Sequence, residues 1–363
     1  MKHYDIAIVG AGMAGASLAA ELAPHARVVL LEGESQPGYH ATGRSAAFWS
    51  ETYGGPHVQP LTTASGPSLR AAGVLASLGS LHLGRAEDDA ALDAFLAAFA
   101  GSGVALEEVD PRAMIPGLRA EWRRAVFEPS CAYIDVAALH ADCLSRARRS
   151  GTDLLTDAPL RAARRKDGGW RLETGVGVLT AAVLVDAAGA WADEVARRAG
   201  VAPLGIRAFR RTMVQLRTDP APPAALPHVG DIAGSFYFKP EAGGRLWLSP
   251  HDEIASDPCD AQPEEIDVAT AIDRFERCVD WRVARIEHKW AGLRSFAPDR
   301  LPVYGFAPDA PGFFWCAGQG GFGIQTAPAA AKLGAALLLG RDAGLPGIDP
   351  DRYRPGRFAD VGV

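Results

Sequence analysis

The chain has 363 residues, of which 48% are apolar and 22% are charged, and its formal net charge is −6. A chain of this kind can bury a large core and is long enough for two domains. The acidic balance argues against a nucleic-acid partner, and the composition argues against disorder. Five scattered cysteines, with no C-x-x-C pair and no histidine at zinc-ligand spacing, give no indication of a metal site.

The apolar stretch near the N-terminus, Ile6 to Leu22, is interrupted by glycines and is too short to cross a bilayer. No other segment reaches the length that a membrane span needs. An odd number of cysteines without a pattern is typical of buried thiols in a reducing compartment. We therefore expect a cytoplasmic protein, and attachment to the periphery of the inner membrane stays open.

The first thirty-two residues predict a dinucleotide site. Asp5 to Val9 is an apolar, β-branched run typical of a buried parallel strand, and Ala16 to Leu22 is typical of a helix. Between them, Gly10 permits a tight turn, Gly12 lets the backbone approach a pyrophosphate, and Gly15 lets helix and strand pack closely. The helix start then presents free N–H groups and a positive dipole end to the phosphates.

A second strand, Arg27 to Leu31, ends in Glu32, which lies where an acidic side chain binds a ribose hydroxyl. A lone G-x-G-x-x-G is weak evidence, but strand, glycines, helix, strand and terminal acid together form a strong pattern. Glu32 also disfavours NADP, whose extra phosphate it would repel. This unit alone leaves NAD and FAD open.

Three later segments favour FAD. The turn-rich loop Gln36 to Ala47 can wrap a flavin, and the apolar strand Val183 to Trp191 contains small residues that permit close approach of a ligand. A glycine-rich loop, Gly318 to Ile324, precedes a helix and can place N–H groups near flavin N1 and O2. The residues expected to contact the cofactor, besides Gly10, Gly12, Gly15 and Glu32, are Arg44, Ser45, Ala47, Gly189, Gly320, Gly321, Gly323, Ile324 and Gln325.

These segments, together with Gly292 to Gly305, resemble those of the D-amino-acid oxidase and glycine oxidase-like flavoproteins. The resemblance runs from Asp5 to about Gly340 and is thin between Pro56 and Pro129. Within that group the chain is most similar to the D-arginine dehydrogenases, at Gln36 to Ala47 and at the segments around Tyr237, Arg294 and Gly320.

The resemblance implies an α/β (α+β overall) fold, with a Rossmann-like FAD-binding domain interleaved with a mixed β-sheet substrate domain. We expect the FAD-binding domain to comprise residues 1–76, 135–200 and 296–363. The substrate domain is expected to comprise residues 77–134 and 201–295.

An enzyme that oxidises amino acids must hold a carboxylate in a dry pocket, and a planar guanidinium does this with two hydrogen bonds. Arg294 lies in an apolar run, where the family places this anchor. Arg211 is a second candidate, with a structural role equally open. The resemblance favours Tyr237 and Tyr53 in the substrate site, although core packing would also explain either tyrosine.

The resemblance implies oxidation of the amine of a small amino acid, with a D-amino acid as the expected substrate, by hydride transfer to flavin N5. The resulting imine hydrolyses to a 2-oxo acid and ammonia. The electron acceptor stays open among oxygen, a quinone and an electron-transfer protein. Where D-arginine dehydrogenases have a histidine this chain has Phe48, and the expected acid aligns near Ser80. We therefore expect a neutral, apolar or cyclic D-amino acid such as D-proline.

Three alternatives remain at this point. The chain could be an N-methylamino-acid (sarcosine-type) oxidase or a 2-hydroxy-acid dehydrogenase, or a non-enzymatic flavoprotein that serves as a binding or assembly module. A cysteine that holds the flavin covalently would favour the sarcosine type. Cys316, however, falls within an expected strand, where a buried core position is the simpler interpretation.

Overall fold

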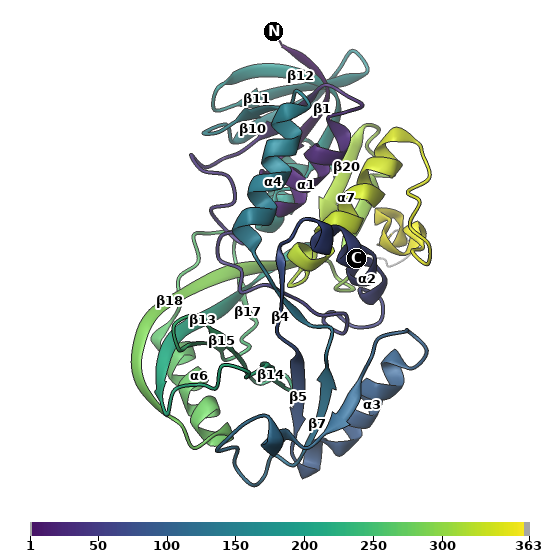
Figure 1. Ribbon diagram of the computed structural model, residues 1–363. Helices are drawn as coiled ribbons and strands as arrows, with labels where there is room; N and C mark the ends of the chain where they lie inside the picture. Colours follow the sequence, from purple (N-terminus) through teal and green to yellow (C-terminus); the bar gives the residue numbers. More distant parts are fainter. Residues whose placement is uncertain (1, 359–363) are drawn as a thin grey trace.

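The unit expected from the glycine motif is present in the computed structural model, which describes residues 2–358 (Figure 1). It consists of β1 (His3–Val9), α1 (Met13–Leu22) and β2 (Val28–Leu31), and the two strands pair in parallel. All four residues of β2 and the last four of β1 are buried. This near-continuous apolar pattern arises because helices or further strands cover both faces of the sheet.

The first sheet surrounds this unit. Its main order is β10 (Leu160–Lys166), β11 (Gly169–Thr174), β12 (Gly177–Asp186), β1, β2 and β9 (Asp153–Leu155). β20 (Phe313–Ala317) pairs in parallel with the end of β12, and β19 (Val303–Phe306) pairs with β20. The centre of the sheet, in the spatial order β9, β2, β1, β12 and β20, is thus parallel, as in a Rossmann fold.

Helices α1, α4 (Val136–Arg149) and α7 (Gly323–Leu339) pack together on one face of the first sheet (Figure 1). Small residues allow this close packing, and a cluster of buried apolar side chains fills the layer. Asp135 begins α4 by accepting a hydrogen bond from the backbone N–H of Ala138. On the other face, α5 (Ala192–Arg198) contacts β10 and β12 over a second apolar cluster.

The second sheet is mixed and strongly curved, and it lies below the first sheet in Figure 1. Its order is β21 (Gln319–Gly320), β18 (Arg282–Phe296), β13 (Arg207–Asp219), β16 (Arg245–Ser249), β15 (Tyr237–Glu241), β14 (His228–Asp231), β5 (Ser80–Gly84), β7 (Arg124–Glu128) and β6 (Glu107–Val109), and β17 (Ile254–Ser256) also pairs with β13. α6 (Glu265–Cys278) and α3 (Asp89–Phe99) pack against this sheet. One face of the sheet and α6 bury a core that includes Phe238, Phe275 and Trp281.

A small third sheet of β3 (Phe48–Trp49), β8 (Ala132–Ile134) and β4 (Leu75–Ser77) connects the two parts. α2 (Gln59–Ala71) follows β3 and packs against α7. Among the described residues, no helix is both long enough and apolar enough to cross a membrane.

The expected fold class is confirmed. All strands of the first sheet fall within the ranges expected for the FAD-binding domain, and those of the second sheet fall in the other ranges except for Phe296 and β21. β21 follows β20 along the chain and pairs with the end of β18, so it connects the two halves. The division into two domains at these boundaries stays a prediction.

Candidate functional site

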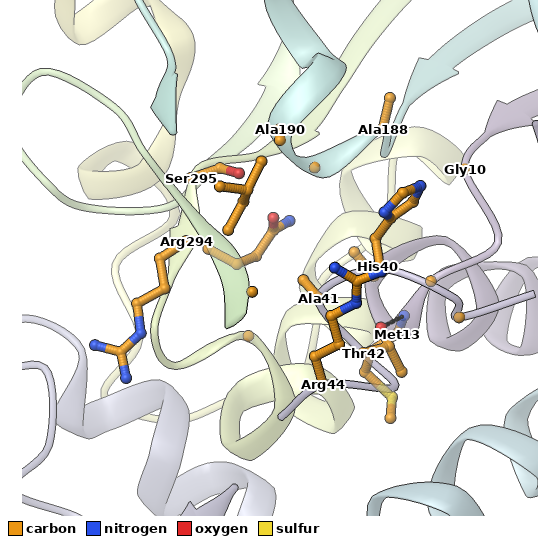
Figure 2. A pocket seen from close by; sticks show the side chains of 18 of the residues that line it. Gly10, Met13, His40, Ala41, Thr42, Arg44, Ala188, Ala190, Arg294 and Ser295 are labelled. Atoms are coloured by element: carbon orange, nitrogen blue, oxygen red, sulfur yellow. Dashed lines mark hydrogen bonds between the residues drawn. The ribbon is translucent and has the colours of Figure 1, made fainter. Parts of the chain in front are cut away.

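A single cavity of about 480 Å³ extends between the two large sheets. Figure 2 shows its lining, with Gly10 and Arg294 on opposite sides of the view. The structure places sixteen of the seventeen residues expected at the site on this cavity; these are Gly10, Gly12, Glu32, Arg44, Ser45, Ala47, Tyr53, Gly189, Arg211, Tyr237, Arg294, Gly320, Gly321, Gly323, Ile324 and Gln325. Gly15 is absent from the lining. Residues separated by up to 315 positions in the sequence therefore meet at one site.

The three glycines of the first loop have different structural roles. Gly10 has a φ of +101°, which L side chains rarely adopt, so it forms the turn out of β1. A Cβ at Gly15 would overlap the carbonyl oxygen of Gly10, so this position needs glycine for packing. Gly12 has an ordinary φ of −70° and lines the cavity at the start of α1. A side chain there would extend into the space that a phosphate would occupy.

Two side chains hold this loop in place. Thr42 accepts a hydrogen bond from the backbone N–H of Met13, 2.9 Å away, at the start of α1 (Figure 2). Glu32 accepts hydrogen bonds from the N–H groups of Ala11 and Glu34, both at 3.0 Å. Its carboxylate is therefore fixed at the end of β2 and retains lone pairs for a ribose hydroxyl. Sequence reasoning did not single out Thr42, because a threonine in a turn has no distinctive signal.

Arg44 connects the loop of residues 36–47 to β18 and to the segment that precedes α6. Its guanidinium donates to the carbonyl oxygens of Ala261 and Ala291 and forms an ion pair with Asp260. In return, the indole N–H of Trp290 donates to the Arg44 carbonyl oxygen at 2.9 Å. The guanidinium is thus occupied by protein partners, while the stem of Arg44 lines the cavity. Its contact with the cofactor stays a prediction.

The C-terminal glycine-rich loop lies opposite, at the start of α7. Gly320 has a φ of +56°, and a Cβ at Gly321 would overlap the Tyr53 hydroxyl and lie 3.1 Å from the Arg294 guanidinium carbon. Gln325 is 2% exposed, and its amide donates to Tyr53 O and accepts from Ser50 N. The lack of a side chain at Gly321 therefore lets Tyr53 and Arg294 pack against this loop, and Gln325 holds the segment that carries Tyr53.

Arg294 is half-buried on β18, and its guanidinium forms no hydrogen bond or ion pair with any other residue of the 2–358 range. Its guanidinium carbon lies 6.0 Å from the centre of the Tyr53 ring, which limits access of water to one side. An unpaired guanidinium in a partly desolvated cavity is costly, and a ligand carboxylate would relieve this cost.

Arg211 lies on β13, next to β18, and is only 4% exposed. Its Nε donates to the carbonyl oxygen of Asp252 at 2.6 Å and its Nη2 to Glu253 at 3.3 Å. The buried Nη1 has no partner among the described residues. Burial, and after it the positive charge of Arg294, lower the pKa of Arg211 to about 10. Arg211 is thus paired with the carboxylates of Asp252 and Glu253, whereas Arg294 beside it has no carboxylate partner among residues 2–358.

Tyr237 and Tyr53 both line the cavity, and their contact with a substrate stays a prediction. Phe236, directly before β15, and Phe238 on β15 belong to the core of the second sheet, so alternation turns Tyr237 to the cavity face. The Tyr237 hydroxyl donates to the Met213 sulfur at 3.0 Å, and burial raises its pKa. Tyr53 is half-buried, with its ring 5.4 Å from that of Phe48.

A buried carboxylate that the sequence did not indicate fixes the segment around Tyr53. Glu128 accepts hydrogen bonds from Ser50 Oγ at 2.8 Å, Glu51 N at 2.6 Å and Thr52 Oγ1 at 2.6 Å. Burial alone raises the pKa of Glu128, but His82, whose Nε2 lies 3.9 Å from the carboxylate, and hydrogen bonds from Thr52 and Ser50 outweigh burial and hold this pKa below its ordinary value. The hydroxyl of Ser50 is thus engaged by Glu128.

Cys316 does not line the cavity. It is buried within β20, and burial raises the pKa of its thiol to about 12. A thiol of this kind is a poor nucleophile, which agrees with the expected core position.

The geometry fits a dinucleotide-flavin cofactor. The cavity is continuous from the glycine turn and Glu32 to the loop of Gly320 and Gly321, and Gly12 and Gly321 keep it free of side chains. The starts of α1 and α7 both meet it, so N–H groups and positive dipole ends are available at two points. These residues would hold the diphosphate and the flavin of FAD.

Comparisons with known proteins agree with this geometry. The family model described as FAD dependent oxidoreductase (DAO) matches residues 5–337. A glycine oxidase of Geobacillus kaustophilus is 26% identical over 363 residues, which covers 93% of this chain and 94% of that protein.

Solved structures show the same fold. That of glycine oxidase from Geobacillus kaustophilus has a TM-score of 0.84 at 24% identity and covers 98% of this chain and 99% of its own. That of L-proline dehydrogenase from P. horikoshii has a TM-score of 0.87 at 21% identity and covers 100% and 99%. The chain belongs to the DAO family of FAD-dependent oxidoreductases.

Proposed function

We propose that this flavoprotein oxidises the amine of a small amino acid, which it binds by the carboxylate at Arg294. The observation that carries the proposal is the half-buried guanidinium of Arg294, which has no partner within residues 2–358. Similar proteins support it, since they include glycine oxidases and a dimethylglycine dehydrogenase.

A planar guanidinium binds a carboxylate with two parallel hydrogen bonds, which fixes the orientation of the substrate. Arg211 Nη1 adds a second buried donor, and the hydroxyl of Tyr53 lies beside Gly321 at the same end. Phe48 and Met213 provide apolar walls. Bound FAD supplies the acceptor for the hydride that leaves the substrate carbon. The protein itself orients the carboxylate and excludes water.

The acidic side chains that line the main cavity are Glu32, Glu34 and Glu194, and none lies on a strand of the second sheet. No carboxylate beside Arg294 on these strands is thus available to take the proton of the substrate ammonium. We infer that the substrate loses this proton to water, so the rate of flavin reduction rises with pH as the neutral amine forms. The imine product then hydrolyses to a 2-oxo acid and ammonia.

The D configuration is part of the proposal and derives from the sequence resemblance. Proteins that share the fold include L-proline dehydrogenase and L-amino acid deaminase, so both enantiomers need to be tested. The similarity to D-arginine dehydrogenases stays a prediction about ancestry. A substrate with a cationic side chain is disfavoured because Arg294 and Arg211 are positively charged. Phe48 is apolar and provides no negative charge to bind such a side chain.

Anaerobic bleaching of the flavin absorbance tests the proposal directly. The FAD-loaded protein is mixed with glycine, D- and L-amino acids, N-methylamino acids and 2-hydroxy acids, and the reduction rate is followed over pH 6–10. We expect amino acids to reduce the flavin, with a rate that increases with pH. Reduction only by 2-hydroxy acids or N-methylamino acids would replace the proposal with that activity. A flavin that no compound reduces would favour the binding-module alternative.

A further inference from the structure

A smaller chamber of about 150 Å³ opens beside the main cavity. It shares four lining residues with that cavity, namely Phe48, Tyr53, Tyr237 and Arg294. Its other walls are mostly polar and are formed by Ser50, Thr52, Gly54, Ser80, His82, His228, Gly230, Asp231, Phe236 and His251. A substrate whose carboxylate is bound at Arg294 therefore has this space within reach of its side chain.

Three of the polar wall residues, Ser80, His82 and His228, belong to one face of the second sheet. Ser80 on β5 is the register partner of His228 on β14, and Gly230 is the partner of both His82 and Tyr237. The residues between them, such as Leu81 and Val229, point to the opposite face and form core. Gly230 adds no side chain, and a Cβ there would lie 3.5 Å from the His228 ring. The sheet thus maintains buried polar groups around a hollow, where apolar residues would be the usual choice.

His228 lines this chamber and has a buried ring nitrogen without a hydrogen-bond partner in the described part of the chain. The residue is 6% exposed, its Nδ1 lies 3.0 Å from Ser80 Oγ, and its buried Nε2 has no partner among residues 2–358. Its ring lies 4.3 Å from that of Phe48 and 5.4 Å from that of Tyr237, so the ring is held by stacking. Because the Ser80 hydroxyl can donate to Nδ1 or accept from it, Nε2 can present either a donor or an acceptor.

His251 provides a fixed acceptor. Its Nδ1 lies 2.6 Å from the carbonyl oxygen of Gly234, and a carbonyl oxygen only accepts, so Nδ1 carries the proton. Burial, and after it the charges of Arg211, Arg294 and Arg274, lower the pKa of His251 to about 3. The ring is therefore neutral near pH 7, and its Nε2 is a lone-pair acceptor.

The chamber offers no free carboxylate. Asp231 accepts from the backbone N–H of Ala233 at 3.0 Å and from both N and Oγ of Ser235. The charge of His228 is also suppressed, because burial first, and then the charges of His82, Lys239 and His251, lower its pKa well below the ordinary value. A cationic side chain would thus meet only a carboxylate whose oxygens already accept from Ala233 and Ser235. Arg294 is expected to bind the carboxylate of the substrate backbone, which leaves no second free cation among the described residues of the chamber lining for an acidic side chain.

We propose that this chamber binds the substrate side chain and selects a neutral group with both a donor and an acceptor, a hydroxyl or a carboxamide, through His228 and His251. The inference rests on the proposed function, since it assigns the side-chain end of the same substrate. It makes His228, with Ser80 holding its ring, a specificity-determining residue. A site built to hydrogen-bond such a group discriminates against an isosteric apolar side chain, because its buried nitrogen would then remain unpaired.

Isosteric pairs of amino acids test this inference. Serine is compared with 2-aminobutyrate, threonine with valine, and asparagine with leucine, in both enantiomers, by anaerobic flavin reduction. We expect the polar member of a pair to have a reduction efficiency at least about tenfold higher. Equal efficiencies, or a preference for arginine, lysine, aspartate or glutamate, would overturn the chamber assignment while leaving amine oxidation intact.

Two substitutions test whether the preference for polar side chains depends on His228 and Ser80. His228→Phe keeps the stacked ring but removes both nitrogens, and Ser80→Ala removes the partner of Nδ1. We expect His228→Phe to bring the polar-to-apolar ratio close to 1 and Ser80→Ala to lower it. His25→Phe, at an exposed histidine outside both cavities, is the matched control and should keep the native ratio. A native ratio in folded, FAD-loaded His228→Phe would contradict the proposal.

Binding of non-reacting ligands tests the side-chain chamber independently of the proposed amine oxidation. Succinamate and 4-methylpentanoate have the side-chain shapes of asparagine and leucine and lack the amine. We expect succinamate to perturb the flavin spectrum at a dissociation constant about tenfold lower, with the difference lost in His228→Phe. If no amino acid reduces the flavin while this difference persists, the proposed function fails and the subsite stands. If neither ligand is preferred, the subsite fails.

Discussion

At the scale of single residues, Arg294 is the group whose loss should be most specific in its effect. Arg294→Lys keeps the charge but loses the planar fork, so we expect kcat/KM to fall about 100-fold, mainly through KM. Arg294→Met should lower it further. Steady-state kinetics with the best amino acid measures both changes, and the FAD content should stay native.

Arg285→Lys, at an exposed position of the same strand, is the control for the Arg294 variants. It should leave kcat/KM unchanged. An Arg294→Met protein with native KM would show that the carboxylate is bound elsewhere, with Arg211 as the next residue to test.

A second prediction at this scale concerns Asp186 and the pH dependence of stability. Its carboxyl is fully buried at the end of β12, Oδ1 accepts from the N–H of Ala188 at 3.1 Å, and Oδ2 has no partner within residues 2–358. Burial raises the pKa of Asp186 well above its ordinary value. The folded protein thus keeps a proton that the unfolded chain loses above its own pKa near 4, so stability falls as pH rises from there towards the folded pKa.

Asp186→Asn removes this titration and keeps the acceptor for Ala188. We expect the melting temperature of the variant relative to the native protein to rise between pH 4 and pH 8, by about 2 °C or more. Thermal melts at a series of pH values measure the difference. Asp309→Asn, at an exposed carboxyl, should show no such trend. A constant difference for Asp186→Asn would mean that this carboxyl is ionised in the folded protein.

At the scale of elements, Glu128 of β7 holds the segment that precedes α2. Glu128→Gln retains the size of the side chain but removes the charge that accepts from Ser50, Glu51 and Thr52. We expect the free energy of unfolding to fall by about 2 kcal/mol at pH 7. KM for the amino acid should also rise, because Tyr53 belongs to the same segment.

The pH dependence distinguishes this role from simple packing. The folded pKa of Glu128 is lowered, so its stabilisation is complete above its ordinary pKa and is lost as pH falls below it. The stability difference between native and Glu128→Gln protein, measured by urea unfolding, should therefore shrink from pH 7 to pH 4. Glu107→Gln, an exposed control, should show little difference at either pH. A difference that does not change with pH would exclude the charge as its origin.

The elements that sequence reasoning identified are those whose signal is local. β1, α1 and β2 follow one another within thirty residues, and alternation along β15 showed that Tyr237 and its phenylalanine neighbours face opposite ways. The chamber could not be found in this way. Ser80 and His228 are 148 residues apart and become neighbours only through the parallel pairing of β5 with β14. Neither a lone serine nor a lone histidine carries a signal before that register is known.

The same limit applies to charged residues whose partners are protein groups that lie far away in the sequence. Arg44 stood out in the sequence because of its loop, yet its guanidinium binds Asp260 and two carbonyl oxygens that lie over 200 positions away. Glu128 accepts its hydrogen bonds from a segment about 77 positions earlier. Long-range partners of this kind decide whether a charged residue meets a ligand or the protein, and sequence patterns do not contain them.

At the scale of the whole molecule, the cavity lies between two sheets that alternate along the chain. Its walls include Gly10 after β1, Tyr237 on β15 and Arg294 on β18, so a bound cofactor would contact both halves. A ligand that binds only the folded state stabilises it by about 4 kcal/mol at a thousandfold excess over its dissociation constant. We therefore expect FAD to raise the melting temperature of the whole chain, and its removal to lower it.

Two glycines of one loop separate this cofactor effect from fold stability. Gly12→Ala adds a methyl group at an ordinary φ to a residue that lines the cavity, and its Cβ has one near neighbour, Thr42 Oγ1 at 3.2 Å. The melting temperature without FAD should stay within about 2 °C of the native value, while the increase on adding FAD should largely disappear. Gly15→Ala places a Cβ against the Gly10 carbonyl oxygen, so it should lower the melting temperature with and without FAD. Calorimetry across FAD concentrations measures both effects, and a native FAD-dependent increase in Gly12→Ala would mean that the diphosphate does not lie against this turn.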